Sequence, residues 1–265
     1  MTDQCEDVGL RFDVDDAVVT ITLCRPETGN AQTPRMWATL AEIGESLPSG
    51  ARVVVLRAEG ESFSSGLDRR MLAPPAVPGD ISLAHLERLD DRALTETVAT
   101  FQEAFGWWRR PDVVTIAAVQ GHAVGAGFQL ALACDLRVLA EDARFAMRET
   151  SLGLVPDLGG TQPLVEAIGY SRALEVCVTG RWIDADEARH LGLATIVVPR
   201  EDLDGTVADL AAALIAPPHD AVTATKALLR TAAARSFPDQ LSAERSAQVD
   251  RIRALPATWT GNNEL

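Results

Sequence analysis

The segment Gly121–Asp135 reads GHAVGAGFQLALACD and has the residue types of a turn that holds a developing negative charge. It follows the β-branched run Val113–Val119 and carries no charge before its last residue, which predicts a strand leading into a buried helix. The first N–H groups of a helix lack intrahelical acceptors, and Gly125, Ala126 and Gly127 are small enough to let an oxygen approach them. The turn is therefore a candidate for half of an oxyanion-binding site.

Two other interpretations of this stretch stay open. The uncharged residues from Val113 to Cys134 are numerous enough to span a bilayer. Gln120, Gly121 and His122 in the middle of the stretch, and the strand-forming run before them, argue against a membrane helix. Alternatively, the glycines serve only the close packing of a strand, a turn and a helix.

The elements that must position this turn alternate between strands and helices. We expect a hairpin with strands over Gly9–Val14 and Ala17–Leu23, a helix over Pro34–Leu47 capped by Thr33, and a strand over Arg52–Arg57. Residues 73–79 (APPAVPG) predict a loop, followed by one long amphipathic helix from Ser82 to Trp108. Later strands are expected over 136–140, 144–147 and 194–198, and later helices over 161–168, 171–179, 185–191, 202–215, 221–234 and 238–255. This order predicts an α/β body followed by a helical C-terminal part.

Composition narrows the class of protein. The 265 residues are 47% hydrophobic, enough for one large core, and the net charge of −14 argues against nucleic acid as a partner. An anionic ligand would need local arginines. The N-terminal sequence has no basic and apolar leader pattern, and the four separated cysteines fit buried thiols in a reducing compartment, so we expect a cytoplasmic protein. The four histidines show no ligand spacing, so no metal is expected.

Four blocks of the chain, in this order and at this spacing, resemble the crotonase family, also called the enoyl-CoA hydratase/isomerase superfamily. The blocks are Arg25-Pro26 with Asn30-Ala31, FSSGLD at 63–68, the segment Gly121–Asp135, and Phe145 through Gln162. The resemblance implies an α/β fold with a spiral of ββα units over residues 1–200, forming two roughly perpendicular sheets. It also implies a helical C-terminal oligomerisation region over 201–265, and a homotrimer or a dimer of trimers.

The resemblance further implies a coenzyme A thioester as substrate, with no separate cofactor, and chemistry through an enolate. By position, the backbone N–H groups of Leu67 and Ala126 would form the oxyanion hole. Substrate and coenzyme A contacts would come from a set of loop residues: Arg25, Ser64, Ser65, Gly66, Asp68 and Gly125. Without the resemblance, FSSGLD is equally a plain turn in which Asp68 caps the following helix.

The same resemblance identifies three side chains for proton transfer. Glu149 matches one glutamate of the family's hydratases, whereas Gln129 stands where those hydratases have the second. An amide orients water but does not exchange a proton at neutral pH. Asp157 stands where hydratases commonly have glycine, and the dienoyl-CoA isomerase branch resembles this chain there. Glu149 could instead pair with Arg148 or Arg144, and Asp157 could simply form a turn after Pro156.

Three functions follow as hypotheses. The first is a double-bond isomerase of acyl-CoA thioesters in fatty acid metabolism, with Glu149 as base and Asp157 as partner acid. The second is an enoyl-CoA hydratase with one glutamate, in which Gln129 holds the water. The third is an acyl-CoA-binding protein without catalysis. The determinants of acyl shape are expected in the loop Met71–Asp80 and in the helix over 82–108.

Overall fold

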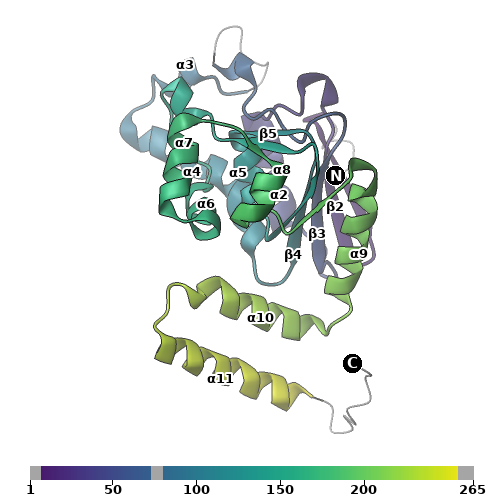
Figure 1. Ribbon diagram of the computed structural model, residues 1–265. Coiled ribbons are helices and arrows are strands. Elements are labelled where there is room, and N and C mark those ends of the chain that lie inside the picture. The colour runs from purple at the N-terminus through teal and green to yellow at the C-terminus, as the bar shows by residue number, and fades with distance from the viewer. Residues whose placement is uncertain (1–6, 73–79, 256–265) are drawn as a thin grey trace. The chain divides into compact units, whose positions relative to one another are not determined.

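The computed structural model describes residues 7–72 and 80–255 of the chain. The loop expected over 73–79 lies outside the described residues. The chain divides into two compact units, the first ending at Leu214 and the second beginning at Ile215. Figure 1 shows the order of the elements along the chain by colour.

The first unit is built on a six-stranded sheet with the order β1-β2-β3-β4-β6-β9. The predicted hairpin is confirmed, since β1 and β2 pair antiparallel around a turn in which Asp16 has a φ of 50°. All other neighbours in this sheet are parallel, and every residue of β4 is buried, as expected for a β-branched run without charge. The strand bounds are β1 Leu10–Asp15, β2 Val18–Leu23, β3 Val53–Ala58, β4 Val114–Val119, β6 Leu136–Ala140 and β9 Ile196–Val198.

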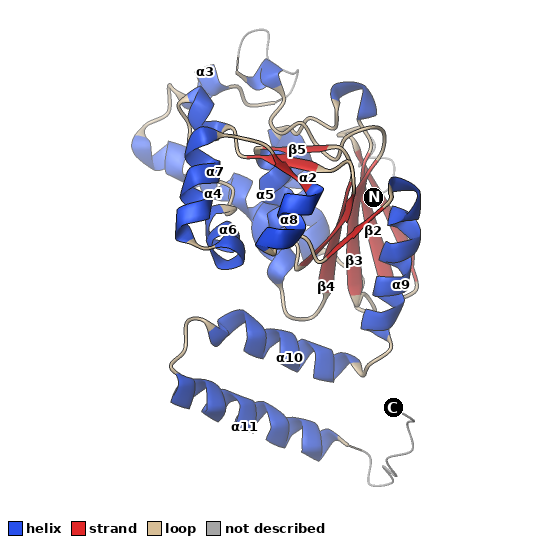
Figure 2. Cartoon of the chain, viewed as in Figure 1, coloured by secondary structure: helices blue, strands red, loops and turns tan. Residues whose placement is uncertain are grey.

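A smaller sheet positions the end of the predicted strand–turn–helix. It contains β5 (His122–Val124), β7 (Arg144–Ala146) and β8 (Ile183–Asp184). Figure 2 shows β5 running across the direction of β2, β3 and β4. A parallel bridge between Ser64 and Ala123 attaches the segment after β3 to β5, which brings two distant parts of the sequence together.

The helices of the first unit cover these sheets. Thr33 caps α2 as predicted, with its hydroxyl accepting from the N–H of Met36. The bounds are α2 Pro34–Glu45, α3 Leu83–Leu86, α4 Asp91–Gly106, α5 Ala126–Ala133, α6 Thr161–Ile168, α7 Tyr170–Thr179, α8 Ala185–Leu191 and α9 Leu203–Ile215. Short 3-10 helices follow Asp68 (η2, Arg69–Met71) and Arg148 (η4, Glu149–Leu152).

The prediction of a single helix over 82–108 is wrong, because the chain forms two α-helices there. Ser82 caps α3 through the N–H of His85, and Asp90 caps α4 through the N–H of Ala93. A capping aspartate adopts an extended backbone, so the helix restarts at Asp91.

The second unit contains α10 (His219–Ala232) and α11 (Phe237–Ala254), joined by an ion pair of 3.1 Å between Arg251 and Asp220. The unit begins later than the boundary expected between residues 200 and 201, because α9 belongs to the first unit. Buried side chains of α9 (Leu203, Val207 and Ala211) and the 3.0 Å ion pair from Asp204 to Arg57 hold it there.

The predicted α/β architecture with a helical C-terminal region is confirmed. The stretch after Val113 forms β4, β5 and the eight-residue helix α5, so its interpretation as a membrane helix is wrong. Among residues 7–72 and 80–255, no helix is long and apolar enough to cross a membrane. Cys134 is buried and Cys24 and Cys177 are half-buried, and none of these three described cysteines is in a disulfide.

Candidate active site

The turn between β5 and α5 leaves one backbone N–H group available. Gly125 has a φ of 51°, a conformation that favours glycine, and its own N–H donates to the carbonyl of Ala146 over 2.9 Å. α5 begins at Ala126, and no side chain caps its N-terminus. Among the described residues, the N–H of Ala126 has no hydrogen-bond acceptor, so an oxygen from outside the chain can accept from it.

A second available N–H belongs to Leu67. Leu67 forms a parallel bridge with Gln32, which donates to the carbonyl of Gly66 and accepts from the N–H of Asp68, each over 2.8 Å. In such a bridge the N–H of the central residue points away from the partner strand. No acceptor for the N–H of Leu67 lies in the described part of the chain.

These two N–H groups come from adjoining segments. Gly66 has a φ of 86°, and a Cβ atom added to it would lie 2.5 Å from the carbonyl oxygen of Val124 and 3.5 Å from the nitrogen of Ala126. Only glycine allows this approach. Leu67 and Ala126 line the same cavity. Two fixed donors at one cavity wall fit the stabilisation of an oxygen that becomes negative during a reaction.

The carboxyl group of Glu149 lies over the same turn. A Cβ atom added to Gly125 would be 3.3 Å from Oε1 of Glu149. This oxygen accepts from Nε2 of Gln129 over 2.7 Å, whereas Oε2 is buried and has no hydrogen-bond partner among the described residues. Burial raises the pKa of the Glu149 carboxyl. Hydrogen bonding from the backbone of Glu149 and, next, from the side chain of Gln129 counteracts this, and the charge of Asp157 adds to the rise.

Gln129 is held on three sides. Its side chain is buried, and Oε1 accepts from the N–H of Leu158 over 2.9 Å and of Gly160 over 3.2 Å. Both lone pairs of Oε1 are thereby used, so the amide has no acceptor left for the proton of a water molecule. The role of water holder that the sequence suggested for Gln129 therefore depends on the second N–H of Nε2 alone.

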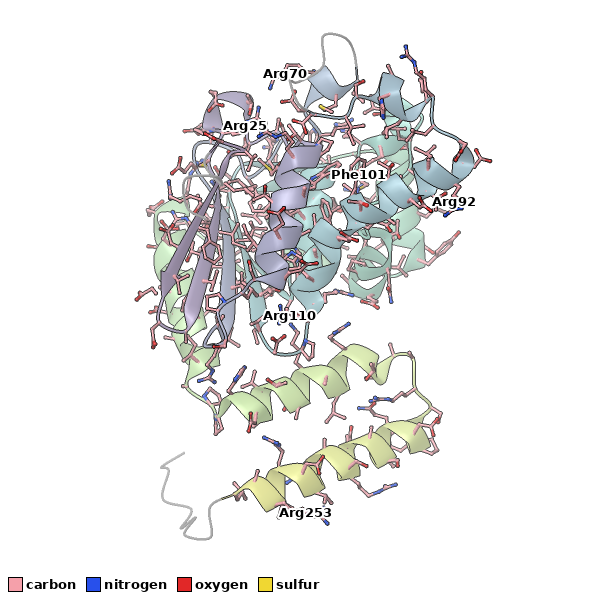
Figure 3. All side chains as sticks on the ribbon, turned by 180° about the vertical axis from the view of Figure 1, so that it is seen from behind. Arg25, Arg70, Arg92, Phe101, Arg110 and Arg253 are labelled. Atoms are coloured by element: carbon pink, nitrogen blue, oxygen red, sulfur yellow. The ribbon has the colours of Figure 1, made fainter. Side chains whose placement is uncertain are left out.

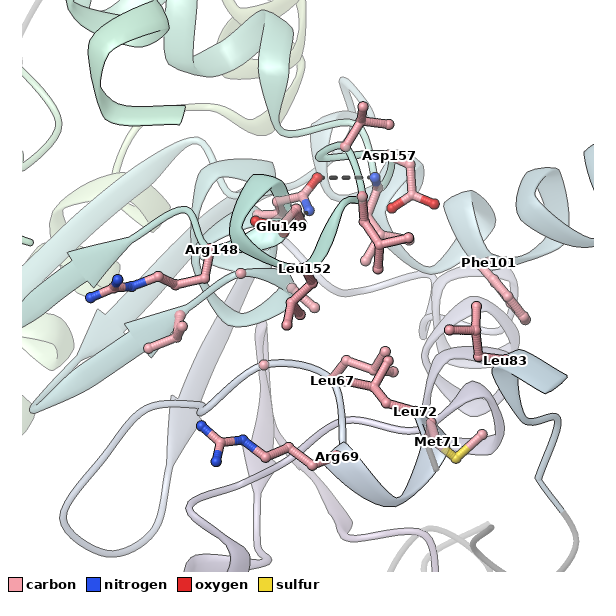
Figure 4. A pocket seen from close by; sticks show the side chains of 18 of the residues that line it. Leu67, Arg69, Met71, Leu72, Leu83, Phe101, Arg148, Glu149, Leu152 and Asp157 are labelled. Carbon is pink, nitrogen blue, oxygen red and sulfur yellow. Dashed lines mark hydrogen bonds between the residues drawn. The ribbon is translucent and has the colours of Figure 1, made fainter. Parts of the chain in front are cut away.

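Asp157 lies on the loop between η4 and α6. The residue is exposed, and Figure 4 shows its carboxyl turned toward the cavity that Glu149 also lines. Although the residue as a whole is exposed, the surrounding side chains partly desolvate its carboxyl, which raises the pKa of Asp157. The backbone carbonyl of Asp157 accepts from Nε2 of Gln102 on α4 over 2.6 Å, which fixes the loop to that helix.

The cavity has a volume of about 1070 Å³ and is mostly apolar. Figure 4 shows Leu67, Leu72, Leu83 and Phe101 along it, with Asp157 on the opposite wall. Several of the apolar side chains come from the segment of η2, α3 and α4, where acyl determinants were expected: Met71, Leu72, Leu83, Leu86, Leu94, Val98 and Phe101. A volume of this size takes a ligand with a long or bulky apolar group.

The structure brings Ser65, Gly66 and Gly125 to the cavity. Arg25, Ser64 and Asp68 are not among the residues that line this cavity, and their contact with the ligand stays a prediction. Ser64 is fully buried, and its hydroxyl donates to the carbonyl of Asn30.

Arg25 and Asp68 instead bind each other. Arg25 donates to Oδ2 of Asp68 over 3.2 Å and to the carbonyl of Ala31 over 2.9 Å. Asp68 also accepts from the backbone and side chain of Arg70, and these hydrogen bonds lower the pKa of Asp68 to about 2. The turn interpretation of FSSGLD is therefore correct for Asp68, which caps η2.

Sequence reasoning did not identify a basic and aromatic group at one end of the cavity. The guanidinium of Arg148 lies 5.2 Å from the ring centroid of Trp182, whose ring contacts that of His122 at 5.1 Å. All three residues line the cavity, as does the exposed Arg69. The ion pair considered between Glu149 and Arg148 is absent from the described residues, since Arg148 packs on Trp182 instead. No residue spacing in the sequence signals this group.

Within the described residues, no group of three histidine, cysteine, aspartate or glutamate side chains is placed to hold a metal ion.

Comparison with known proteins gives consistent relatives. A family model described as enoyl-CoA hydratase/isomerase matches residues 13–255. A "Probable enoyl-CoA hydratase 2, mitochondrial" of Arabidopsis thaliana is 34% identical over 186 residues, covering 69% of this chain and 58% of that protein. A "Delta(3,5)-Delta(2,4)-dienoyl-CoA isomerase, mitochondrial" of Dictyostelium discoideum is 30% identical over 197 residues, covering 73% of this chain and 66% of that protein. The match thus spans less than two thirds of either relative.

Solved structures match over nearly the whole chain. A crystal structure of a "putative enoyl-CoA hydratase" from Thermobifida fusca YX, in complex with acetoacetyl-CoA, has a TM-score of 0.93 at 47% identity, covering 96% of this chain and 99% of that one. A further Thermobifida fusca YX structure, in complex with CoA, has a TM-score of 0.91 at the same identity, covering 96% of each chain. These overlaps confirm the predicted fold.

Proposed function

Because the chain belongs to the enoyl-CoA hydratase/isomerase family, we propose that it moves a carbon–carbon double bond along the acyl chain of a coenzyme A thioester. The observation that carries the proposal is the shared cavity. Two acids with raised pKa values, Glu149 and Asp157, line the same cavity as the available N–H groups of Leu67 and Ala126.

The reaction begins at Glu149. Its carboxylate takes a proton from an acidic carbon of the acyl chain, and the electron pair of that C–H bond passes to the thioester oxygen, forming an enolate. The N–H groups of Leu67 and Ala126 donate to this oxygen as it becomes negative, so they stabilise the transition state more than the bound substrate.

Asp157 completes the transfer at another carbon. Its carboxyl gives a proton to the far end of the conjugated enolate, the electron pair returns from the oxygen, and the double bond stands at a new position. Glu149 then holds a proton and Asp157 lacks one, so the starting state returns when Glu149 releases its proton to solvent and the exposed Asp157 takes one up. The raised pKa values suit this work, because general acids and bases act best when their pKa values approach the working pH.

A second candidate function is hydration of an enoyl-CoA by Glu149 alone. The names of the Thermobifida fusca and Arabidopsis thaliana relatives favour it. Gln129 speaks against it, since its amide oxygen already accepts two hydrogen bonds. A protein that binds acyl-CoA without turnover is the remaining alternative.

One experiment distinguishes these three activities. The protein is incubated with 2-enoyl-, 3-enoyl- and dienoyl-CoA esters in deuterated water, and products are identified by mass spectrometry. Isomerisation gives deuterium on carbon without added water, whereas hydration increases the mass by one water. The isomerase proposal requires Glu149→Gln to abolish deuterium incorporation and Asp157→Asn to slow product formation. Unchanged incorporation in Glu149→Gln contradicts it, and tight binding without turnover establishes the binding protein.

We also propose that the active protein is a homotrimer or a dimer of trimers, acts in fatty acid β-oxidation and resides in the cytoplasm. Light scattering coupled to size-exclusion chromatography measures the assembly directly.

A further inference from the structure

Gln129 contacts both halves of the proposed acid–base pair. Nε2 donates to Oε1 of Glu149 over 2.7 Å. Oε1 of Gln129 accepts from the N–H of Leu158 and of Gly160, on the loop directly after Asp157. One buried side chain thus connects the base with the loop that carries the acid.

The chemistry of these partners determines which way the Gln129 amide faces. Only its oxygen can accept from the two N–H groups, and only its NH₂ group can donate to a carboxylate. A flipped amide would set N–H against N–H and oxygen against the Glu149 carboxylate. A single orientation therefore satisfies all three hydrogen bonds.

The loop fits closely around Gln129. A Cβ atom added to Gly160 would lie 2.6 Å from Cγ of Gln129, so only glycine lets the loop come near enough for its N–H to reach the amide. Gln129 is 1% exposed, so solvent competes little for these hydrogen bonds.

We propose that Gln129 is a positioning residue that binds Oε1 of Glu149, leaves Oε2 as the oxygen that takes the substrate proton, and holds the Asp157 loop at a fixed place relative to that base. The inference rests on the proposed function for the roles of Glu149 and Asp157. Glu149 lines the cavity, and its Oε2 is buried without a hydrogen-bond partner among the described residues, so it is the carboxyl oxygen that Gln129 leaves unoccupied.

The hydrogen bonds of Gln129 also explain what an amide does at this position that the glutamate of the family's hydratases would not do here. A carboxylate at residue 129 would still accept from Leu158 and Gly160, but its second oxygen would face Oε1 of Glu149 at about the 2.7 Å of the present bond. Two carboxylates at this distance share a proton, which raises the pKa of the pair. Gln129 instead donates to Glu149 and favours its charged form.

Two substitutions test the inference. Gln129→Met keeps an unbranched side chain but removes all three hydrogen bonds, and Gln129→Glu keeps the loop contacts while placing an acid beside Glu149. We expect Gln129→Met to lower kcat by roughly tenfold or more with KM nearly unchanged. In both variants the acidic limb of the kcat/KM profile should move to higher pH, and further in Gln129→Glu. Gln162→Met, on α6 outside the cavity, is the control, because it also removes a glutamine that donates to a glutamate.

A measurement without substrate separates this inference from the proposed function. The Glu149 carboxyl is titrated by NMR in protein labelled at glutamate Cδ, with Glu149→Gln used for assignment. A raised titration midpoint in Gln129→Met and Gln129→Glu supports the positioning role even if no isomerisation is found. An unchanged midpoint in both variants overturns it, as does rapid crotonyl-CoA hydration by Gln129→Glu with an unchanged pH profile. Should Gln129→Met fail to fold, Gln129→Glu decides alone.

Discussion

Nε2 of Gln102 on α4 donates to the backbone carbonyl of Asp157 over 2.6 Å. The helix that forms one wall of the cavity is thereby joined to the loop that carries the proposed acid. A movement of α4 would therefore pull on the Asp157 loop, so the position of Asp157 in the cavity depends on the position of α4.

The Gln102 bond leads to the first prediction. Gln102→Leu removes the donor, so the Asp157 loop samples more positions, and we expect kcat for isomerisation to fall about tenfold. Steady-state kinetics measure the change, and hydrogen exchange of the backbone around residue 158 should become faster. Glu103→Gln is the control, because Glu103 is the exposed neighbour of Gln102. Unchanged kcat in Gln102→Leu would show that the bond does not serve catalysis.

Gly66→Ala tests the oxyanion donors. The added Cβ atom would lie 2.5 Å from the carbonyl of Val124 in a residue whose φ is 86°, so the Leu67 N–H must move. Loss of one such donor typically lowers kcat by about 10²–10³-fold. Gly169→Ala controls for backbone strain, because Gly169 has a φ of 77° with open space around its Cβ position. Equal kinetic losses in both variants would assign the effect to strain alone.

Arg69→Ala tests recognition of the anionic part of coenzyme A. Figure 4 shows Arg69 and Arg148 toward the end of the cavity away from Phe101. The protein carries a net charge of −14, so a nearby arginine must supply the attraction. We expect KM to rise about threefold to fivefold with kcat unchanged, and the difference to shrink at high salt. Arg92→Ala is the control, since Arg92 on α4 pairs with Glu96, lies outside the cavity lining and points outward in Figure 3.

Asp68→Asn tests a stabilising ion pair rather than catalysis. Arg70 and Arg25 lower the pKa of Asp68 from its ordinary 3.8 to about 2, so the charged carboxylate stabilises the fold above the ordinary value. We expect the variant to lose about 2 kcal/mol in urea unfolding at neutral pH. The difference from the wild type should vanish as the pH falls from 3.8 to about 2.

Asp186→Asn is the control for Asp68→Asn. Its partner Arg189 and its own side chain are both exposed, so solvent screens the pair and little stability should be lost. A pH-independent loss in Asp68→Asn would point to packing instead of charge.

Much of the fold follows from local patterns. The β-branched run at 113–119 gives β4, as predicted, and a sharp turn at Gly125 leads into α5, but the strand β5 that lies between β4 and this turn was not expected. The break between α3 and α4 is not visible in the apolar spacing: α3 ends at Leu86, and α4 begins after Asp90, whose side chain accepts from the N–H of Ala93. Aspartate suits a helix interior poorly, but from the sequence alone Asp90 can be assigned either to the interior of one long helix or to the cap of a second helix.

The site was less predictable because its contacts join distant residues. Leu67 and Ala126 could be placed by resemblance, and the structure brings them to one cavity. The pairing of Arg25 with Asp68 crosses 43 positions, and the bonds from Gln129 to Leu158 and Gly160 cross 29 and 31. No local pattern encodes such partners, so the positions of Arg25, Asp68 and Gln129 had to come from the structure.

Val98→Trp tests whether α4 sets the length of the acyl group. Val98 lies between Leu94 and Phe101 along one face of α4, and all three line the cavity. Figure 3 shows Phe101 pointing toward α2, where its ring lies 5.1 Å from that of Trp37, so this wall is backed by packed aromatic rings. A tryptophan at 98 must therefore project into the cavity.

We expect Val98→Trp to lower kcat/KM for a decenoyl-CoA by roughly tenfold or more, because the tryptophan fills the space for the carbons at the far end of the acyl chain. The short crotonyl-CoA should still bind as well as before. The comparison is made with matched substrates under identical conditions. Ala99→Trp adds the same bulk on the exposed side of α4 and should leave both substrates unaffected. If Val98→Trp impairs both chain lengths equally, the acyl group lies elsewhere and the wall formed by α4 has another role.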